Sequence, residues 1–188
     1  LNYDSLSAIP DDIDIAYYLV HSMSASISDF EQMEKKSALI FKKRIEMTKV
    51  RQVIYLSGII NTKKLSRHLS SRKAVEEALH SEAYALTTLR AGIILGSGSA
   101  SFEIIRDLVE KLPLMIAPRW LHTKSQPIGI TNVVEFLSKI KLDEFTFNKS
   151  FDIGGPEVLS YKEMLERFAK IRKLKRWIFV LPIMTPKL

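Results

Sequence analysis

The chain has 188 residues, the length of a single domain with room for a substantial hydrophobic core. Lys and Arg number 28 against 21 Asp and Glu, so the net charge is +7, and 46% of the residues are hydrophobic. The sequence contains no cysteine, which excludes disulfides, thiol nucleophiles, iron–sulfur clusters and cysteine zinc sites. This favours a reducing compartment, which we expect to be the cytoplasm. The longest apolar run, Trp177 to Met184, is far shorter than the roughly 20 residues of a membrane-spanning helix.

Short apolar runs and amphipathic segments alternate along the first half of the chain. Three runs are typical of strands buried in a parallel sheet: Ile13 to Val20, Gln52 to Leu56 and Ala85 to Leu89. Helical spacing of apolar residues predicts helices between them, reaching from about Phe30 to Met47 and from Arg67 to Ser81. Strands and helices at this spacing predict adjacent parallel strands joined by crossover helices.

The second half continues the alternation with shorter elements. Further helices are predicted over 100–112, 131–140 and 160–173, and short strands over 114–116, 127–130 and 150–153. Ser160 and Glu163 form an S-x-x-E capping box at the start of the last helix. The whole pattern predicts an α/β fold, with a parallel sheet covered by helices on both faces.

Candidate ligand positions follow directly on the predicted strands, because ligands of such sheets bind outside the carboxyl ends of the strands. These positions are His21-Ser22, Ser57-Gly58 and Arg90 to Ser99. Ser57 and the glycines of the third segment are also typical of ordinary turns. The strand ends alone therefore leave both interpretations open.

The order of these segments resembles one protein family. Five stretches carry the resemblance: DIDIAYYLVHS from Asp12, RQVIYLSG from Arg51, LRAGIILGSGS from Leu89, QPIGITNVVEFL from Gln126 and FDIGGPEVLSYKEML from Phe151. They are similar to successive segments of the extended and atypical short-chain dehydrogenases/reductases, which include nucleoside-diphosphate-sugar epimerases and NmrA-like regulators. The resemblance implies a Rossmann-like parallel sheet and binding of NAD or NADP.

One departure from the family concerns the cofactor phosphates. The family binds the pyrophosphate with a G-x-x-G-x-x-G turn after its first strand, and this motif is absent from the sequence. We therefore expect that the first βαβ unit is missing, and that NAD or NADP binds only where this N-terminal segment is present. The loss would expose Ile13 to Val20 as a sheet edge, so we expect poor solubility or a homodimer.

The resemblance to this family also implies a division of the chain into three parts. Residues 1–112 are interpreted as an incomplete Rossmann-like dinucleotide-binding domain, and residues 113–176 as the substrate-side, C-terminal part of the same domain. Residues 177–188 are interpreted as a linker or the start of a further domain.

A second departure concerns catalysis. The family uses Tyr-x-x-x-Lys on one helix, but the residue four positions after each of the six tyrosines is never Lys. Aligning the helix HLSSRKAVE with the family puts His68 at the Tyr position and Arg72 at the Lys position, with Glu76 four residues further. The resemblance then implies that His68 exchanges a proton, Arg72 holds the cofactor ribose, and Ser57 binds the substrate oxygen. The alternative is that His68 lies in an exposed first turn and that Arg72 extends past the edge of the core.

The resemblance also implies binding positions. Cofactor contacts are expected from Leu19, Val20, His21, Arg72, Ala91, Gly92 and Ile93, and substrate contacts from Ser97, Arg119, Trp120 and Gln126. No metal site is expected, because the remaining histidines, His80 and His122, show no metal-ligand spacing.

Two functions are compatible with these features. The first is an NAD(P)-binding atypical reductase or epimerase-like protein that acts on an unidentified small molecule. The alternative is a non-catalytic NAD(P)-dependent sensor or assembly factor with a degenerate active site. Fold alone does not choose between them.

A basic segment precedes the apolar C-terminal run. Lys170, Arg172, Lys173, Lys175 and Arg176 are followed by WIFVLPIM, which could lie on an anionic membrane surface or contact nucleic acid phosphates. We favour a third interpretation, a solvated helix end followed by a strand or linker. No nucleic acid partner is expected, because the aromatic and glycine pattern of single-strand binding modules is missing.

Overall fold

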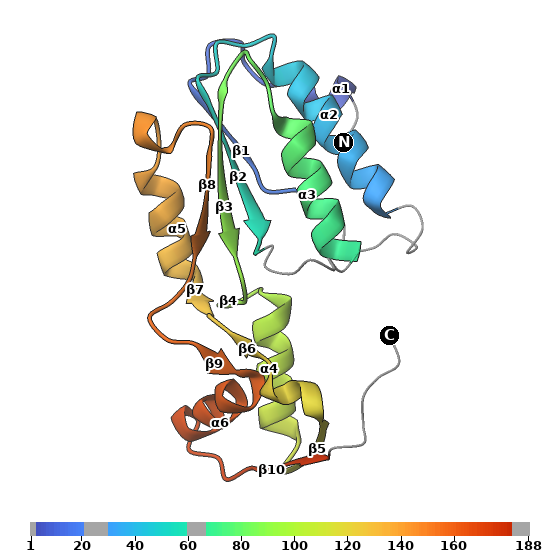
Figure 1. Cartoon of the computed structure of the whole chain (residues 1–188), viewed down its shortest axis with the longest axis vertical. Coiled ribbons are helices and arrows are strands. Elements are labelled where there is room, and N and C mark those ends of the chain that lie inside the picture. Colours follow the sequence, from blue (N-terminus) through green and yellow to red (C-terminus); the bar gives the residue numbers. More distant parts are fainter. Residues whose placement is uncertain (1–2, 21–29, 60–66, 182–188) are drawn as a thin grey trace. The chain divides into compact units, whose positions relative to one another are not determined.

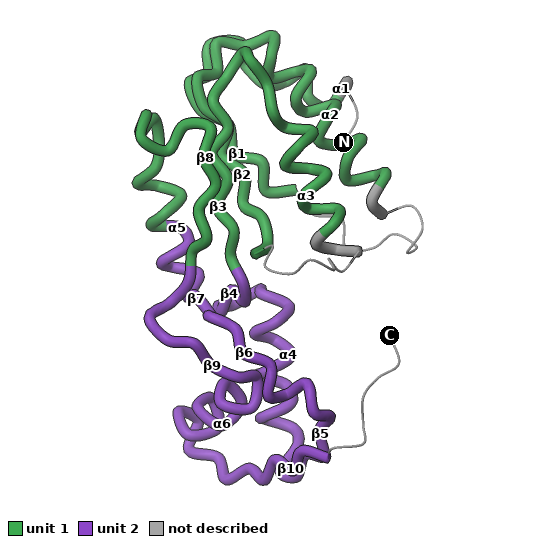
Figure 2. Tube along the Cα trace, viewed as in Figure 1, with its two compact units in different colours: residues 1–91, 135–153 green, residues 92–134, 154–188 purple. Residues whose placement is uncertain are grey.

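The computed structural model describes residues 3–20, 30–59 and 67–181 (Figure 1). The chain divides into two compact units, each built from two separate stretches (Figure 2). Unit 1 comprises Leu1–Ala91 and Glu135–Ile153, and unit 2 comprises Gly92–Val134 and Gly154–Leu188. This division follows spatial contacts, and the domain boundaries predicted at 112 and 176 stay predictions.

Unit 1 contains a four-stranded parallel sheet in the order β1-β2-β3-β8. Its strands are β1 (Ile15–Tyr18), β2 (Gln52–Gly58), β3 (Ala85–Ala91) and β8 (Lys149–Ile153). The three strands predicted in the first half are therefore adjacent and parallel, which confirms the prediction. Strand β2 runs two residues beyond its predicted end, so Ser57 belongs to the strand.

Helices cover both faces of this sheet, as predicted (Figure 1). Helices α2 (Phe30–Ile45) and α3 (Arg67–Leu79) lie on one face, with the short α1 (Tyr3–Leu6) against α2. Helix α5 (Ile130–Lys139) lies on the other, where the Tyr17 hydroxyl donates to the Leu137 carbonyl at 2.9 Å. The short η2 (Glu144–Thr146) precedes β8, and the Gln52 side-chain amide donates to the hydroxyl of Thr146 at 3.3 Å.

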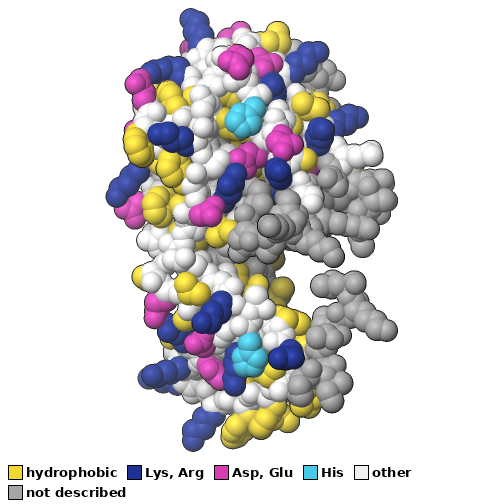
Figure 3. All heavy atoms as spheres, viewed as in Figure 1, with side chains coloured by type: hydrophobic (Ala, Val, Ile, Leu, Met, Phe, Trp, Pro, Cys, Tyr) yellow, Lys and Arg dark blue, Asp and Glu magenta, His cyan; other side chains and the backbone are white. Residues whose placement is uncertain are grey.

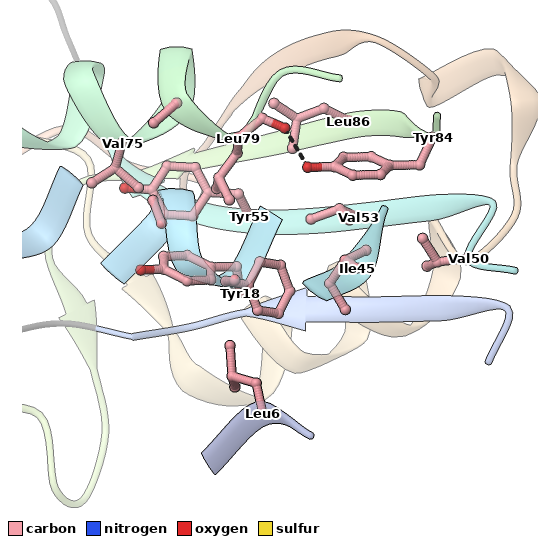
Figure 4. Packing of buried hydrophobic residues seen from close by; sticks show 13 residues of the cluster. Leu6, Tyr18, Ile45, Val50, Val53, Tyr55, Val75, Leu79, Tyr84 and Leu86 are labelled. Carbon is pink, nitrogen blue, oxygen red and sulfur yellow. Dashed lines mark hydrogen bonds between the residues drawn. The ribbon is translucent and has the colours of Figure 1, made fainter. Parts of the chain in front are cut away.

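The core of unit 1 lies between the sheet and helices α2 and α3 (Figure 4). Side chains alternate along each strand, so Val53 and Tyr55 of β2 face this core. The Tyr18 ring packs against Phe41 with centroids 4.9 Å apart, and the Tyr84 hydroxyl donates to the Leu79 carbonyl at 2.6 Å. Burial of each large side chain here contributes about 1.5–3 kcal/mol to folding. This core therefore stabilises the packing of α2 and α3 on the sheet.

Unit 2 is built from helices α4 (Ala100–Lys111) and α6 (Tyr161–Ile171) and three short two-stranded sheets. The strand pairs are β4 (Ile94–Leu95) with β7 (Ile128–Gly129), β6 (Lys124–Ser125) with β9 (Leu159–Ser160), and β5 (Leu114–Pro118) with β10 (Trp177–Leu181). The 3-10 helix η1 (Arg119–His122) follows β5. The predicted capping box is confirmed at the start of α6, where the Glu163 backbone N–H donates to the Ser160 hydroxyl at 3.2 Å.

Strand β10 begins the segment that was interpreted as a linker or a further domain. It pairs in parallel with β5, with Trp177 opposite Leu114 and Phe179 opposite Ile116. Its alternate residues Ile178 and Val180 pack against the core of unit 2. The first five residues of the predicted tail are thus a structural part of unit 2.

Across the described ranges, no helix combines the length and the apolar character that crossing a lipid bilayer requires.

Candidate functional site

The candidate site of unit 1 lies at the carboxyl ends of its parallel strands. Ser57 is the sixth residue of β2, and Ala91 ends β3 in register opposite Ile153. Leu19 and Val20 follow β1 directly and are exposed. The structure therefore brings together four of the predicted site residues at this end of the sheet.

The buried Ser57 hydroxyl makes no hydrogen bond of normal geometry among the described residues, although it lies close enough to the Tyr55 phenol to lower the pKa of that group. The residue is only 3% exposed. Leaving such a group unsatisfied costs about 1–3 kcal/mol, so native proteins rarely retain one without a role. A polar atom of a ligand at this position would satisfy the hydroxyl.

Two buried tyrosines lie beside Ser57. Tyr18 and Tyr55 are opposite each other in β1 and β2, with ring centroids 5.9 Å apart, and both phenol oxygens point toward the end at which β1 stops (Figure 4). Burial raises the pKa of Tyr18 above its ordinary value, and the neighbouring Tyr55 and Glu34 raise it further. Tyr18 therefore stays protonated at neutral pH and can donate a hydrogen bond but cannot act as a base.

Tyr55 connects this pair to helix α3. Its hydroxyl donates to the backbone carbonyl of Arg72 at 3.5 Å. Burial raises the pKa of Tyr55, while the Ser57 hydroxyl and the Arg72 guanidinium act in the opposite direction. Arg72 is half-buried, so the helix brings a positive charge next to the end of β2.

A buried carboxylate completes what we call the unit 1 polar cluster. Glu34 of α2 is 7% exposed and accepts a hydrogen bond from the fully buried hydroxyl of Ser71 in α3. The members of the cluster are Tyr18, Glu34, Tyr55, Ser57, Ser71 and Arg72. Glu34 and Ser71 were not among the predicted site residues. A signal existed, since Glu34 shares the apolar stripe of α2 with Ala38 and Phe41.

Helix α3 is held against the sheet by one ion-pair network. The Glu76 carboxylate pairs with the Arg90 guanidinium through two hydrogen bonds, of 2.8 and 3.3 Å, and accepts a third from the Ser150 hydroxyl at 2.7 Å. Arg90 lies in β3 and Ser150 in β8. Because Arg72 precedes Glu76 by one helical turn, this network fixes the position at which Arg72 meets the sheet.

Two predicted residues cannot be placed by their side chains. His68 falls in the first turn of α3, but its side chain lies outside the described residues. His21 lies outside the described residues altogether. Their implied roles stay predictions. Within the described part of the chain, no three His, Asp or Glu side chains gather in a metal-binding group.

The remaining predicted residues belong to unit 2. Gly92 and Ser97 are exposed, and Ser97 lies in the turn between β4 and α4. Ile93 is buried, and its carbonyl accepts a hydrogen bond from the Ile128 backbone at 2.9 Å. Ile93, predicted to contact the cofactor, thus has a structural contact in unit 2.

The predicted substrate contacts of unit 2 occupy two turns. Arg119 and Trp120 are exposed on η1, and the Trp120 ring meets Tyr161 edge to face with centroids 5.6 Å apart. The Gln126 side chain donates to the Gly155 carbonyl at 2.6 Å. Gln126 also fills the space that a side chain at Gly154 would need, because an added Cβ would lie 2.8 Å from it. Gln126 therefore stabilises the Gly154-Gly155 turn.

No protein-family model matches the chain. A curated protein, "NADH dehydrogenase [ubiquinone] 1 alpha subcomplex subunit 9, mitochondrial" from Arabidopsis thaliana, is 25% identical over 146 residues. The match covers 77% of this chain and 36% of that protein, so the chain spans about a third of the length of this relative.

Solved structures share the fold at low sequence identity. RMD from Pseudomonas aeruginosa, complexed with NADPH, superposes with a TM-score of 0.78 at 12% identity, over 95% of this chain and 74% of its own. UDP-glucuronic acid 4-epimerase from Bacillus cereus, in complex with NAD, gives a TM-score of 0.76 at 14% identity, over 94% and 65%. These structures share the fold of the chain, so the Rossmann-like α/β fold that the resemblance implied is confirmed.

Proposed function

We propose that the chain is part of an NAD(P)-binding atypical reductase or epimerase-like protein that acts on a small molecule. The observation that carries the proposal is the buried Ser57 hydroxyl near the carboxyl end of β2, which makes no hydrogen bond of normal geometry among the described residues. Ligands of open parallel sheets bind beyond this end of the strands. Structures of the same fold that hold NAD or NADPH support the choice of cofactor.

The residues at this end of the sheet fit the nicotinamide end of such a cofactor. Arg72 would hold the ribose hydroxyls through its fixed array of donors, and Ser57 would donate to a substrate oxygen. Leu19 and Val20 offer apolar surface beside them. Bound NAD(P) supplies the hydride acceptor or donor. The phosphate-binding glycine turn has no counterpart in the sequence, so we expect weak binding by residues 1–188 alone.

His68 is the residue that we assign to proton exchange. An imidazole titrates near neutral pH, whereas an Arg guanidinium stays protonated. Tyr18 and Tyr55 are unsuited to this role because burial raises the pKa of each phenol. His68 lies one helical turn before Arg72 in the sequence of α3.

The alternative is a non-catalytic NAD(P)-dependent sensor or assembly factor. One observation favours it: Tyr-x-x-x-Lys is absent from the sequence. In this case Ser57 and Arg72 would bind NAD(P), and the protein would respond to the bound cofactor without converting a substrate. The two functions differ in turnover and agree in cofactor binding.

The test is a titration of the full natural chain with NADH and NADPH, followed by turnover assays on a panel of carbonyl compounds. We expect cofactor binding, weakened at least about tenfold by Arg72→Ala, because a hydrogen bond to a charged group is lost. His68→Ala should leave cofactor affinity unchanged and lower turnover by about 100-fold or more. Ser81→Ala, a substitution at the surface of unit 1, is the control and should change neither cofactor binding nor turnover. Failure to bind either cofactor overturns the proposal, and binding without turnover favours the sensor.

A further inference from the structure

The outer face of the β5 and β10 pair in unit 2 is apolar and exposed. Side chains alternate along both strands, so one set packs inward and the other points to solvent. Figure 3 shows hydrophobic side chains gathered at the lower edge of the molecule, where Figure 1 places these strands. The exposed set, which we call the β5/β10 outer face, consists of Leu114, Ile116, Trp177, Phe179 and Leu181.

The strand register makes this face continuous. Trp177 lies opposite Leu114, and Phe179 lies opposite Ile116. Trp177 is 59% exposed and Phe179 is 55% exposed. Contiguous apolar surface of this kind marks an interaction site, because isolated soluble proteins rarely expose it.

A basic segment borders the face. Residues 170–176 comprise the last two residues of α6 and the connection to β10, and they include five Lys or Arg residues and no Asp or Glu. Arg172 pairs with Glu110 at 3.1 Å, and the Arg176 guanidinium donates to the Val109 and Glu110 carbonyls. Lys170, Lys173 and Lys175 have no ion-pair partner within the described part of the chain. Three lysines therefore stay available to an anionic partner.

Basic and apolar groups meet at Trp177. Lys175, Trp177 and Phe179 are alternate exposed residues of one extended segment, so the lysine continues the row of the outer face. A cavity of about 410 Å³ opens there. Its lining includes Lys170, Lys175, Arg176 and Trp177, together with Ala169, Leu174 and Glu166.

We propose that unit 2 docks onto an anionic phospholipid bilayer through the β5/β10 outer face. Trp177 and Phe179 would enter the boundary between headgroups and acyl chains, where aromatic side chains are favoured. Lys170 and Lys175 would bind a lipid phosphate in the cavity, and Lys173 would add attraction to the anionic surface. The sequence alone favoured a solvated helix end. The pairing of β10 with β5 builds the apolar face that this interpretation lacked.

Two other kinds of partner fit the β5/β10 outer face less well than a bilayer does. A second copy docked symmetrically through the same face would bring two basic segments together, and like charges repel. A nucleic acid would engage the lysines, but the aliphatic side chains of Leu114, Ile116 and Leu181 offer its phosphates no contact. An acidic protein would satisfy the charges and is left to the experiment.

The experiment is vesicle flotation with the full chain. Vesicles of neutral phosphatidylcholine are compared with vesicles that also contain phosphatidylserine. We expect binding to the anionic vesicles and a marked loss with added salt, since surface charge attraction is screened. In a Trp120→Phe variant, Trp177 is the single tryptophan, and its fluorescence should shift to the blue on binding and be quenched by brominated acyl chains.

Matched variants separate the contributions of charge and apolar surface. Changing Lys170, Lys173 and Lys175 to Glu should weaken binding at least about 100-fold, because each surface charge adds about fivefold. Changing Lys35, Lys36 and Lys141 of unit 1 to Glu alters the net charge equally and should weaken binding less than about threefold. Trp177→Ser with Phe179→Ser should weaken it at least about tenfold, whereas Val158→Ser, at a position 56% exposed, should leave it unchanged.

Several outcomes would overturn the proposal. They are equal binding to neutral and anionic vesicles, no change in Trp177 fluorescence, or equal loss in both sets of Lys variants. Binding to soluble polyglutamate without binding to vesicles would favour an acidic protein partner instead. Concentration-dependent dimerisation that Phe179→Ser abolishes would favour a second copy. Circular dichroism of each variant checks that the fold is retained.

Discussion

The Ser71 hydroxyl of α3 donates a hydrogen bond to the Glu34 carboxylate of α2, and both side chains are buried. The bond joins the two helices that cover one face of the sheet, above the ends of β1 and β2. It places a carboxylate beside two protonated tyrosines, and this arrangement depends on the contact between the helices.

Ser71→Ala should destabilise unit 1, because the buried Glu34 carboxylate loses a donor. We expect the free energy of unfolding to fall by about 1–3 kcal/mol, measured by urea denaturation. Ser81→Ala is the matched control, since the Ser81 hydroxyl donates to the Glu46 carboxylate at an exposed position. Its effect should stay within about 0.5 kcal/mol. If both variants lowered the free energy of unfolding equally, burial of the Ser71–Glu34 hydrogen bond would not increase its contribution to stability.

Glu76→Gln should loosen α3 from the sheet, because it leaves the partly buried Arg90 guanidinium without its carboxylate. Removing one partner of a buried ion pair costs about 3–5 kcal/mol, and partial exposure of Arg90 reduces the expected loss to about 2–3 kcal/mol. The measurement is again urea denaturation. Glu135→Gln breaks the exposed pair with Lys139 and should cost less than about 0.5 kcal/mol. A larger effect of Glu135→Gln would contradict the assignment of Glu76 as the anchor of α3.

The fold was predictable from local patterns to a large extent. The apolar runs of β1, β2 and β3 are each short and continuous, and the stripe of α2 repeats at helical spacing, so order and direction followed from the residues. The pairing of β10 with β5 was not predictable, because it joins segments far apart in the chain. The sequence predicts a short strand over 114–116 and a strand or linker after the basic segment, but it does not show that the two segments pair.

The candidate site was predictable only in outline. Ser57 and Arg72 followed from the resemblance, but burial of Ser57 without a partner depends on neighbours contributed by other elements. The same is true of Glu34, which a helical pattern marks as a polar residue on an apolar stripe without showing that Ser71 lies beside it. Desolvation and hydrogen-bond satisfaction are properties of the packed state, so no spacing in the sequence encodes them directly.

Tyr18 should make the protein sensitive to alkali. Burial raises the folded-state pKa of Tyr18 above the ordinary 10.0, so the folded state favours the protonated phenol. The resulting stability is fully present below pH 10.0 and is lost as the pH rises from there toward the folded pKa, because the unfolded chain ionises first. Tyr18→Phe should make the alkaline fall in melting temperature shallower. Tyr17→Phe, on the more exposed opposite face, should change it less. Equal slopes for the wild type and Tyr18→Phe would contradict the prediction.

Ser57→Ala should separate stability from binding. In the free protein the substitution removes a buried hydroxyl that makes no hydrogen bond of normal geometry among the described residues, so the free energy of unfolding should stay unchanged or rise by up to about 1 kcal/mol. Ser71→Ala removes an equally buried but hydrogen-bonded hydroxyl and should lower it. If Ser57 binds a substrate oxygen, Ser57→Ala should also reduce turnover by about tenfold, since one hydrogen bond is lost in the complex. Thermal denaturation and turnover of the same two preparations provide the measurement. A marked loss of stability in Ser57→Ala would mean that the hydroxyl has a structural partner, and Ser57 would then no longer support a ligand site at the end of β2.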